Sequence, residues 1–244
     1  MRSFDYIESG KTLLTPHTTS LLAAIHEAKG RQSIQTTIRP DILGTLVAVA
    51  RIQSTDASNR IEGISTSDSR LNDLVSEKVT PRNRNEEEIA GYRDALSVIH
   101  ESHDYIPITP NVILQLHRDL FRHTPLTFAG HFKDSDNVII ERDAHGTSTV
   151  RFAPPSALVT PELIERACSA YTQAIRDGHT DPLLAIAMFI LDFICIHPFN
   201  DGNGRMSRLL TLLMLYRNGY MVGKYISIEH LIEQSKSTYY EALD

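Results

Sequence analysis

The stretch that decides the fold runs from Cys195 to Leu210 and reads CIHPFNDGNGRMSRLL. The segment before it, Pro182–Ile196, is apolar on nearly every side, which is typical of a buried helix. Pro198 prevents simple continuation of that helix, so we expect His197 to stand at its end, inside the protein. The polar stretch is therefore predicted to be a loop that leads into a second, leucine-rich helix.

A loop at a helix N-terminus is suited to anions, because free backbone N–H groups and the positive end of the helix dipole point into it. Gly202 and Gly204 let an anion approach the backbone closely. Arg205 and Arg208 lie three residues apart on one helical face, so we expect both guanidinium groups to reach one polyphosphate. These features predict a phosphate-binding loop.

Asp201 and His197 supply the other groups that phosphate chemistry requires. A lone carboxylate in a cationic loop suits Mg²⁺, which takes one or two carboxylates together with substrate phosphates. A histidine titrates near neutral pH and can act as a general base. Each residue alone has a simpler interpretation, as a helix end, a turn or a solvated face. Together they predict phosphoryl or nucleotidyl transfer from a magnesium nucleotide.

Most of the remaining chain is predicted to be helical. A capping residue followed by proline marks three helix starts, at Thr109, Thr160 and Asp181. Residues 137–153 differ, because two β-rich runs flank a polar turn, which predicts a hairpin. We therefore predict a mainly α fold with one small β-hairpin.

The polar connector Ser76–Glu86 is the best candidate for a boundary within the chain. It would separate an N-terminal helical region, residues 1–80, from a core formed by residues 81–244.

The composition limits the classes of function. The 244 residues are 41% apolar and carry a net charge of −6, which argues against a broad nucleic-acid surface. Two cysteines are too few for a disulfide framework and favour a reducing compartment. The N-terminus has no apolar signal segment, and no apolar run reaches the ~20 residues that a bilayer requires. We therefore expect a cytoplasmic protein without membrane contact.

The segment HPFNDGNGRMSR, from His197 to Arg208, resembles the signature of the Fic (filamentation induced by cAMP) family, H-x-F-x-(D/E)-G-N-G-R-x-x-R, at every specified position. The surrounding helices and the preceding hairpin also follow the family's order. The resemblance implies a Fic-type helical bundle with a β-hairpin flap beside the active-site loop, residues 197–208. Family members commonly transfer AMP from ATP to a protein hydroxyl group.

The same resemblance assigns roles to individual residues. His197 would deprotonate a Ser, Thr or Tyr hydroxyl of the target protein, and Asp201 would hold Mg²⁺, with Mn²⁺ as an alternative. Tyr239 and Tyr240 are similar to a tyrosine pair near the nucleotide base in some relatives. The residues that would bind ATP are Gly202, Asn203, Gly204, Arg205, Arg208 and Tyr240.

A second motif, SNRIEG, spans Ser58–Gly63. Ser58 and Glu62 face the same way on a helix, and Gly63 suits the C-cap. Glu62 then lies at the negative helix end, where a cation such as Arg208 would relieve it, although a solvated glutamate is the simpler interpretation. The stretch resembles the inhibitory motif (S/T)-x-x-x-E-(G/N) of Fic proteins. The resemblance implies that Glu62 pairs with Arg208 and blocks productive seating of the γ-phosphate.

The hairpin would position the target. An exposed strand edge, here Val138, Ile139 and Ile140, can pair with an extended segment through backbone hydrogen bonds. The alternative is that the hairpin merely covers the core.

Several functions compatible with this sequence remain. The first is a protein adenylyltransferase autoinhibited by Glu62, acting on a target protein and on itself. The others are removal of AMP, another nucleotidyl or phosphoryl transfer, a non-catalytic nucleotide-sensing regulator, and a DNA-binding regulator, which the acidic balance disfavours. A homodimer is left open.

Overall fold

The computed structural model describes residues 4–38, 40–142 and 148–242 of the chain. Helices make up most of these residues, so the prediction of a mainly α fold is confirmed. The N-terminal elements are α1 (Tyr6–Leu13), α2 (Pro16–Ile38), α3 (Pro40–Ile61) and α4 (Asp68–Val75). The elements that follow are α5 (Arg84–Ser102), η1 (His103–Tyr105), α6 (Pro110–Leu120), β1 (Ile139–Arg142), β2 (Ser148–Phe152), η2 (Ala157–Val159), α7 (Thr160–Asp177), α8 (Pro182–Ile196), α9 (Asn203–Arg217), η3 (Val222–Lys224), α10 (Ile228–Gln234) and α11 (Lys236–Glu241).

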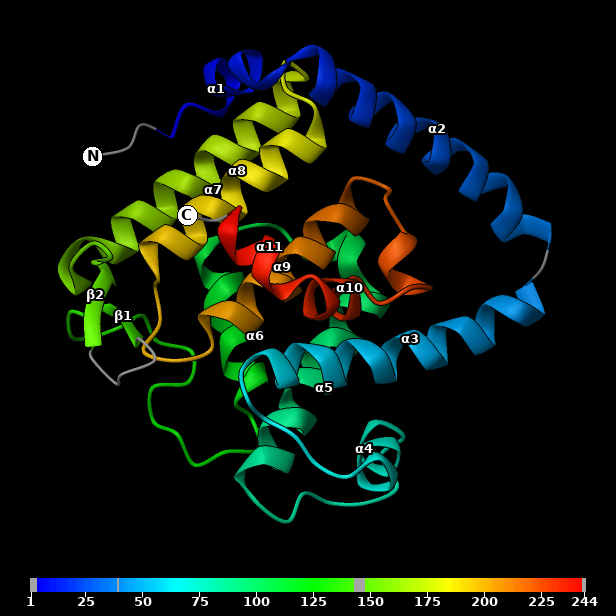
Figure 1. The fold of residues 1–244 in the computed structure, drawn as a ribbon, viewed down its shortest axis with the longest axis vertical. Coiled ribbons are helices and arrows are strands. Elements are labelled where there is room, and N and C mark those ends of the chain that lie inside the picture. Colours follow the sequence, from blue (N-terminus) through cyan, green and yellow to red (C-terminus); the bar gives the residue numbers. More distant parts are fainter. Residues whose placement is uncertain (1–3, 39, 143–147, 243–244) are drawn as a thin grey trace.

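Helix α8 contributes many of the buried residues of the core. It packs against α7 and α9, while α5 packs against α6 and α9 (Figure 1). Phe189 and Phe193 of α8 are completely buried, as expected for a helix that is apolar on nearly every side. The helix begins where Asp181 caps it, with the carboxylate accepting from the N–H of Leu183 at 2.8 Å. At the other end of α8, Ile196 is buried, so the helix ends inside the protein.

Helices α2 and α3 are long, and they approach each other away from the other helices (Figure 1). Helix α3 packs against α5 and α10. A hydrogen bond of 3.0 Å joins the buried hydroxyls of Ser54 on α3 and Ser227 before α10. Lys236 of α11 donates to the carbonyl of Ile61 at 3.0 Å, at the last residue of α3. The C-terminal helices thus hold the end of α3 against the core.

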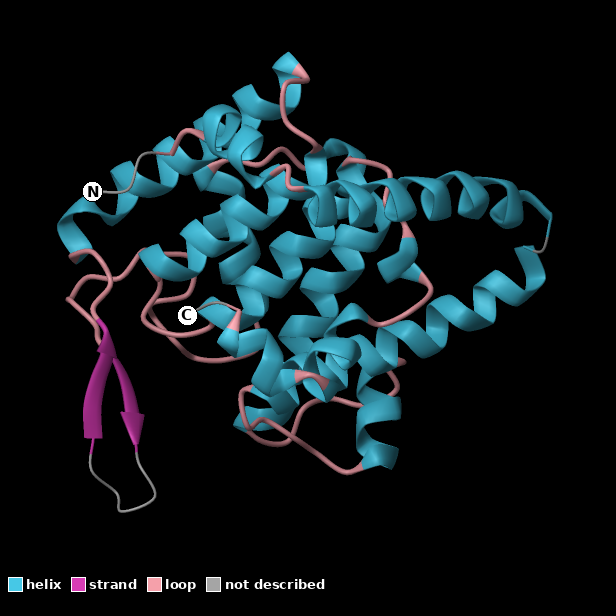
Figure 2. Ribbon diagram, turned by 45° about the horizontal axis from the view of Figure 1, so that its top comes forward, coloured by secondary structure: helices cyan, strands magenta, loops and turns pink. Residues whose placement is uncertain are grey.

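The two strands form an antiparallel pair in which Ile140 lies opposite Val150, with an irregularity between Ile139 and Ile140. Both strands fall within the range where the sequence predicts a hairpin. The pair projects away from the helices (Figure 2). The turn at residues 143–147 and the side chains of Ile139 and Ile140 lie outside the described residues.

None of the helices in the described ranges combines the length and the continuous apolar character that crossing a lipid bilayer requires. Both cysteines, Cys168 and Cys195, are free thiols.

Candidate active site

His197 caps the C-terminus of α8 with a left-handed backbone, at φ 50° and ψ 62°. Its N–H still donates to the carbonyl of Phe193 at 3.0 Å, so the last turn of the helix is closed before the chain reverses. A positive φ is uncommon outside glycine, and in the described residues only Glu77 shares it. The sequence prediction that the histidine stands at the end of a buried helix is therefore matched by the structure.

The environment of His197 favours the neutral imidazole. Burial is the largest influence that lowers its pKa, and the ammonium group of Lys133 lowers it further. The backbone carbonyl of Ile194 and the carboxylate of Glu62 act in the opposite direction. Nδ1 is buried and meets no partner with hydrogen-bond geometry among the described residues. A neutral ring is the form that can accept a proton.

The loop after His197 is fixed from inside. Phe199 is completely buried, and its backbone N–H and carbonyl bond to the side chain of Asn203 at 2.9 and 2.8 Å. Gly202 has φ 82°, and a Cβ there would collide with the ring of Phe121. The side chain of Asn203 is thus occupied within the loop, which leaves its backbone N–H as the group for a phosphate.

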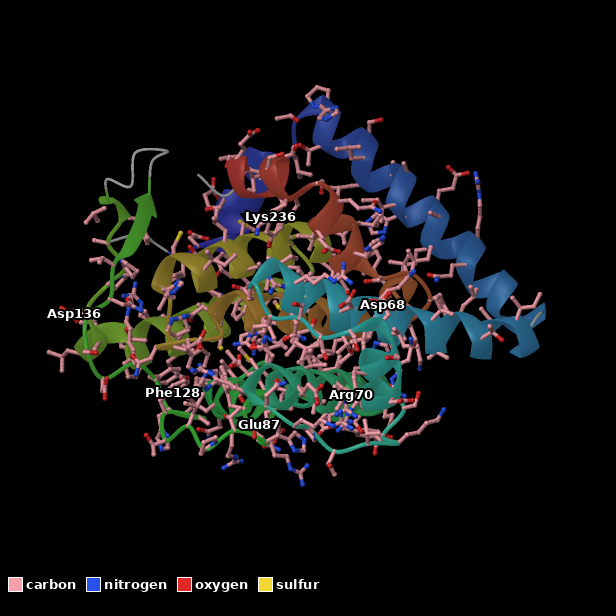
Figure 3. All side chains as sticks on the ribbon, turned by 60° about the horizontal axis from the view of Figure 1, so that its bottom comes forward. Asp68, Arg70, Glu87, Phe128, Asp136 and Lys236 are labelled. Atoms are coloured by element: carbon pink, nitrogen blue, oxygen red, sulfur yellow. The ribbon has the colours of Figure 1, made fainter. Side chains whose placement is uncertain are left out.

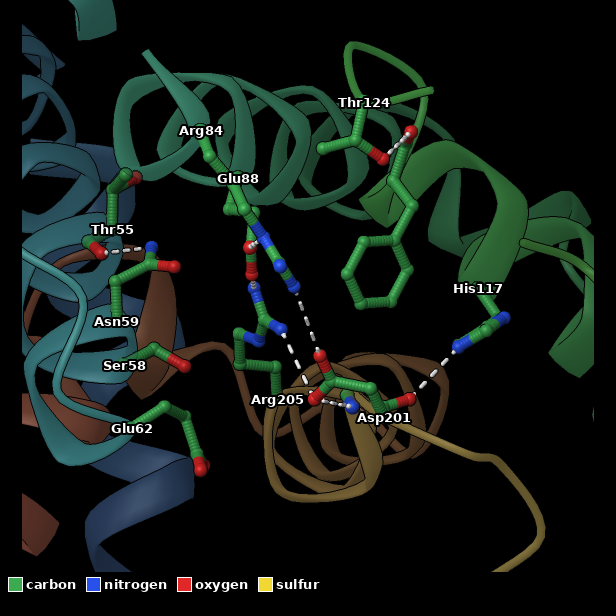
Figure 4. Close-up of polar contacts among 12 residues, drawn as sticks. Thr55, Ser58, Asn59, Glu62, Arg84, Glu88, His117, Thr124, Asp201 and Arg205 are labelled. Atoms are coloured by element: carbon green, nitrogen blue, oxygen red, sulfur yellow. Dashed lines mark hydrogen bonds and ion pairs between the residues drawn. The ribbon is translucent and has the colours of Figure 1, made fainter. Parts of the chain in front are cut away.

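Asp201 is the partly exposed acid of the loop, with 46% of its side chain accessible. Its Oδ1 accepts from the N–H of Gly202 at 2.6 Å and lies 3.7 Å from Nη2 of Arg205. Its Oδ2 lies 3.8 Å from Nη2 of Arg84 (Figure 4). The carboxylate therefore stands between two guanidinium groups at the mouth of the loop.

The sequence predicts that Arg205 and Arg208 reach the same ligand, but in the structure they contact different residues. Arg205 is 1% exposed and donates to Glu88 Oε2 at 2.7 Å (Figure 4). Its guanidinium group also lies over the face of Phe121. Glu88 also accepts from Nε of Arg84 at 2.8 Å. The spacing of three residues turns the long side chains to different neighbours. Arg205 is therefore held by Glu88 with its Nη2 near the Asp201 carboxylate, and it does not extend into the loop.

Arg208 faces the end of α3. Its Nε donates to Oγ of Ser58 at 2.8 Å, and its Nη2 donates to the Ser58 carbonyl at 2.9 Å. The same Nη2 donates to Oε1 of Glu62 at 2.7 Å. Gly63 follows with φ 79° and donates to the Arg60 carbonyl, which ends the helix. Ser58 and Glu62 of the SNRIEG motif thus hold the guanidinium group of Arg208, and Gly63 ends the helix that carries them.

The backbone N–H groups of Gly202, Asn203 and Gly204 at the start of α9 form a cradle that fits an oxyanion. A Cβ added at Gly204 would occupy the place where Oε1 of Glu62 now lies, so a carboxylate already fills the space above this backbone. The described residues contain no cluster of three or more metal-binding side chains. A single carboxylate such as Asp201 nevertheless fits Mg²⁺, because this ion takes its other ligands from phosphates and water.

The other predicted site residues are placed less completely. Val138 is 51% exposed and precedes β1. Tyr240 belongs to α11, but its side chain lies outside the described residues. Burial raises the pKa of Tyr239, and both Arg208 and Glu62 act on its hydroxyl, so Tyr239 lies beside the pair that they form.

Four residues of the site carry no motif and were not predicted. Glu88 and Arg84 begin α5, and Lys133 lies between α6 and β1. His117 could have been noticed, since its position on the apolar face of α6 predicts a buried histidine. The sequence gives no local signal for the other three. Lys133 bonds to Ile196, 63 positions later, and Glu88 bonds to Arg205, 117 positions later. Arg84 joins the site through Glu88.

Comparison with known proteins identifies relatives of this chain. Residues 107–215 match the sequence model of the Fic/DOC family. The chain is 37% identical over 90 residues to a Fido domain-containing protein of Dictyostelium discoideum, covering 35% of this chain and 58% of that protein. It is 28% identical over 145 residues to protein adenylyltransferase fic-1 of Caenorhabditis elegans, covering 56% of this chain and 25% of that protein. The chain thus spans less than two thirds of the length of either relative.

The fold also has solved counterparts. A Fic domain-containing signaling protein from Bacteroides thetaiotaomicron superposes with a TM-score of 0.74 at 24% identity, covering 91% of this chain and 80% of that one.

Proposed function

Since residues 107–215 of this chain form a Fic domain, we propose that the protein is a protein adenylyltransferase. It transfers AMP from ATP to a Ser, Thr or Tyr hydroxyl of a target protein and of its own chain, in the cytoplasm. The observation that carries the proposal is the arrangement of the loop 197–208. A neutral imidazole, a carboxylate and an amide cradle surround the start of one helix.

The reaction follows from these groups. The imidazole of His197 accepts the proton of the target hydroxyl as its oxygen attacks the α-phosphorus of ATP. The bond from that phosphorus to the bridging oxygen breaks, and pyrophosphate leaves. Asp201 would hold Mg²⁺, which neutralises phosphate charge, and the amides of Gly202, Asn203 and Gly204 bind phosphate oxygens. A general base of this kind contributes ~10²–10⁴-fold.

Two other elements complete the proposal. The Glu62–Arg208 contact keeps Arg208 from the γ-phosphate, and the Glu62 carboxylate fills the cradle, so the protein is autoinhibited. The hairpin is the flap that positions the target, through backbone pairing along Val138, Ile139 and Ile140.

Removal of AMP from a modified target is a second candidate. It is favoured by the position of Glu62, whose carboxylate lies over Gly204 and acts on the pKa of His197. A water molecule would then replace the hydroxyl as nucleophile.

Transfer of label from ATP tests the proposal. We expect little label from α-labelled ATP with the parent, strong label with Glu62→Gly, and none with Glu62→Gly/His197→Asn, since Asn tolerates the left-handed backbone at this position. Label from γ-labelled ATP would instead indicate a kinase. Glu77→Gly is the matched control, because Glu77 also follows a helix end but lies away from the site. Equal label in the parent and Glu62→Gly would refute autoinhibition.

A further inference from the structure

Lys133 is a buried cation beside the proposed catalytic base. It lies between α6 and β1 and is 3% exposed. Its Nζ donates to the carbonyl of Ile196 at 3.2 Å, and its backbone N–H donates to the carbonyl of Pro198 at 2.8 Å. These two carbonyl groups belong to the residues that directly precede and follow His197. One residue therefore holds the chain before and after the base.

Two residues near Lys133 in the chain, Asp136 and Asn137, connect it to the hairpin. Asn137 accepts from Nζ of Lys133 at 2.9 Å and donates to the carbonyl of Phe199 at 3.4 Å. Asp136 accepts from the N–H of Ala157 at 2.8 Å, beyond the second strand. Asp136 lies on the side of the molecule from which the hairpin projects (Figure 3). Residues 133–137 thus join the loop of the base to both ends of the hairpin.

The charge of Lys133 has no close counter-ion among the residues that the structure describes. Burial lowers the pKa of Lys133, and Asp136 offsets this only in part. A buried cation without an ion pair costs stability, and an apolar residue of similar size would avoid that cost. The ammonium group does lie at the C-terminal end of α8, where a cation is favoured. The charge of Lys133 lowers the pKa of His197, and the carboxylate of Glu62 raises it.

We propose that Lys133 is a positioning residue for AMP transfer: by holding the carbonyl groups of Ile196 and Pro198 it fixes the imidazole of His197, and through Asn137 it couples that base to the hairpin that presents the target. The inference rests on the proposed function, because it assigns a role within that reaction.

The kinetic test uses the Glu62→Gly protein, in which transfer is measurable. Lys133→Met should lower kcat by about 10- to 100-fold, because small displacements of a base have effects of this size, while KM for ATP changes less than about twofold. Lys133→Arg keeps the charge but replaces a compact ammonium group by a planar guanidinium group, so kcat should also fall. Asn137→Ala, which leaves Lys133 in place, should lower kcat less and raise KM for the target.

Lys224→Met is the matched control. Lys224 donates to the carbonyl of His100 at 3.3 Å near the end of α5 and lowers the pKa of that buried histidine, away from the site. Its loss should leave kcat unchanged. If Lys133→Met and Lys224→Met reduce kcat equally, or if Lys133→Met leaves kcat as in the parent, the inference is wrong.

A second readout does not require activity. Titration of His197 followed by NMR should show a pKa that rises by about half a pH unit or more in Lys133→Met and stays near the parent value in Lys133→Arg. Thermal unfolding confirms that each variant is folded. If the Glu62→Gly protein transfers no AMP, the proposed function fails. An unchanged His197 titration in Lys133→Met overturns the inference itself.

Discussion

The imidazole ring of His117 lies parallel to the ring of Phe199, with centroids 3.7 Å apart and planes inclined by 2°. Its Nδ1 accepts from the backbone N–H of Gly130 at 2.9 Å, so its proton is on Nε2, which donates to the carbonyl of Asp201 at 3.0 Å. One side chain from α6 thereby fixes the two loop residues on either side of Asn200.

Loss of this contact should loosen the loop. We expect His117→Ala to lower the free energy of unfolding by about 2–4 kcal/mol, because ring stacking and two hydrogen bonds of buried groups are lost. The concentration of Mg²⁺ needed for half-maximal transfer should rise in the Glu62→Gly background. Urea unfolding and a metal titration measure the two effects. The exposed His131 provides the control, as His131→Ala.

The buried pair of Glu88 and Arg205 should matter far more than an exposed pair. Glu88→Ala leaves the guanidinium group of Arg205, 1% exposed, without its carboxylate, and we expect a loss of about 3–5 kcal/mol in urea unfolding. Glu8→Ala removes the partner of Lys11 in a solvent-exposed pair and should change stability far less than Glu88→Ala. Similar losses in both variants would contradict this account of Arg205.

The buried His100 should make the fold sensitive to acid. Burial lowers its pKa from 6.5 to about 4. Between these values the unfolded chain binds the proton and the folded chain does not, so stability is complete above about pH 6.5 and falls as the pH approaches 4. The difference corresponds to about 3 kcal/mol. Urea unfolding from pH 8 to 4.5 measures the slope, which should be smaller in His100→Phe.

Gly204 should be needed for nucleotide binding even when Glu62 is absent. A Cβ at this position would occupy the space above the α9 N-terminus that Glu62 now fills. We expect Glu62→Gly/Gly204→Ala to bind ATP at least about tenfold more weakly than Glu62→Gly, since an oxyanion can no longer approach the backbone. Calorimetry measures the affinity. Gly44→Ala on α3, where a Cβ meets nothing, should have no effect on it.

The sequence predicts those parts of the structure that depend on local signals. The caps at Thr109 and Asp181 are where the residue pattern places them, because a side-chain oxygen next to a proline specifies a helix start by itself. At Thr160 the helix begins with the threonine, and Val159 is the residue before it. The loop from His197 to Arg208 could be read as an anion site for the same reason.

The parts that sequence could not predict depend on long-range packing. Arg205 was expected to face a ligand, but Glu88, 117 positions earlier, encloses it. Lys133 and His117 bind backbone carbonyls, which any residue offers, so no residue type marks the partner. Such contacts become visible only when the helices are placed in space.

The hydrogen bond from Lys236 to the carbonyl of Ile61, the last residue of α3, has a consequence for the order of folding. This bond joins positions 175 apart, and the Ser54–Ser227 bond joins positions 173 apart. During synthesis the loop at residues 197–208 leaves the ribosome before residues 228–241 do, and contacts of large sequence separation form late. The nascent chain therefore exposes residues 197–208 before the helices that hold the end of α3 have docked, so the contact that we propose to be inhibitory forms last.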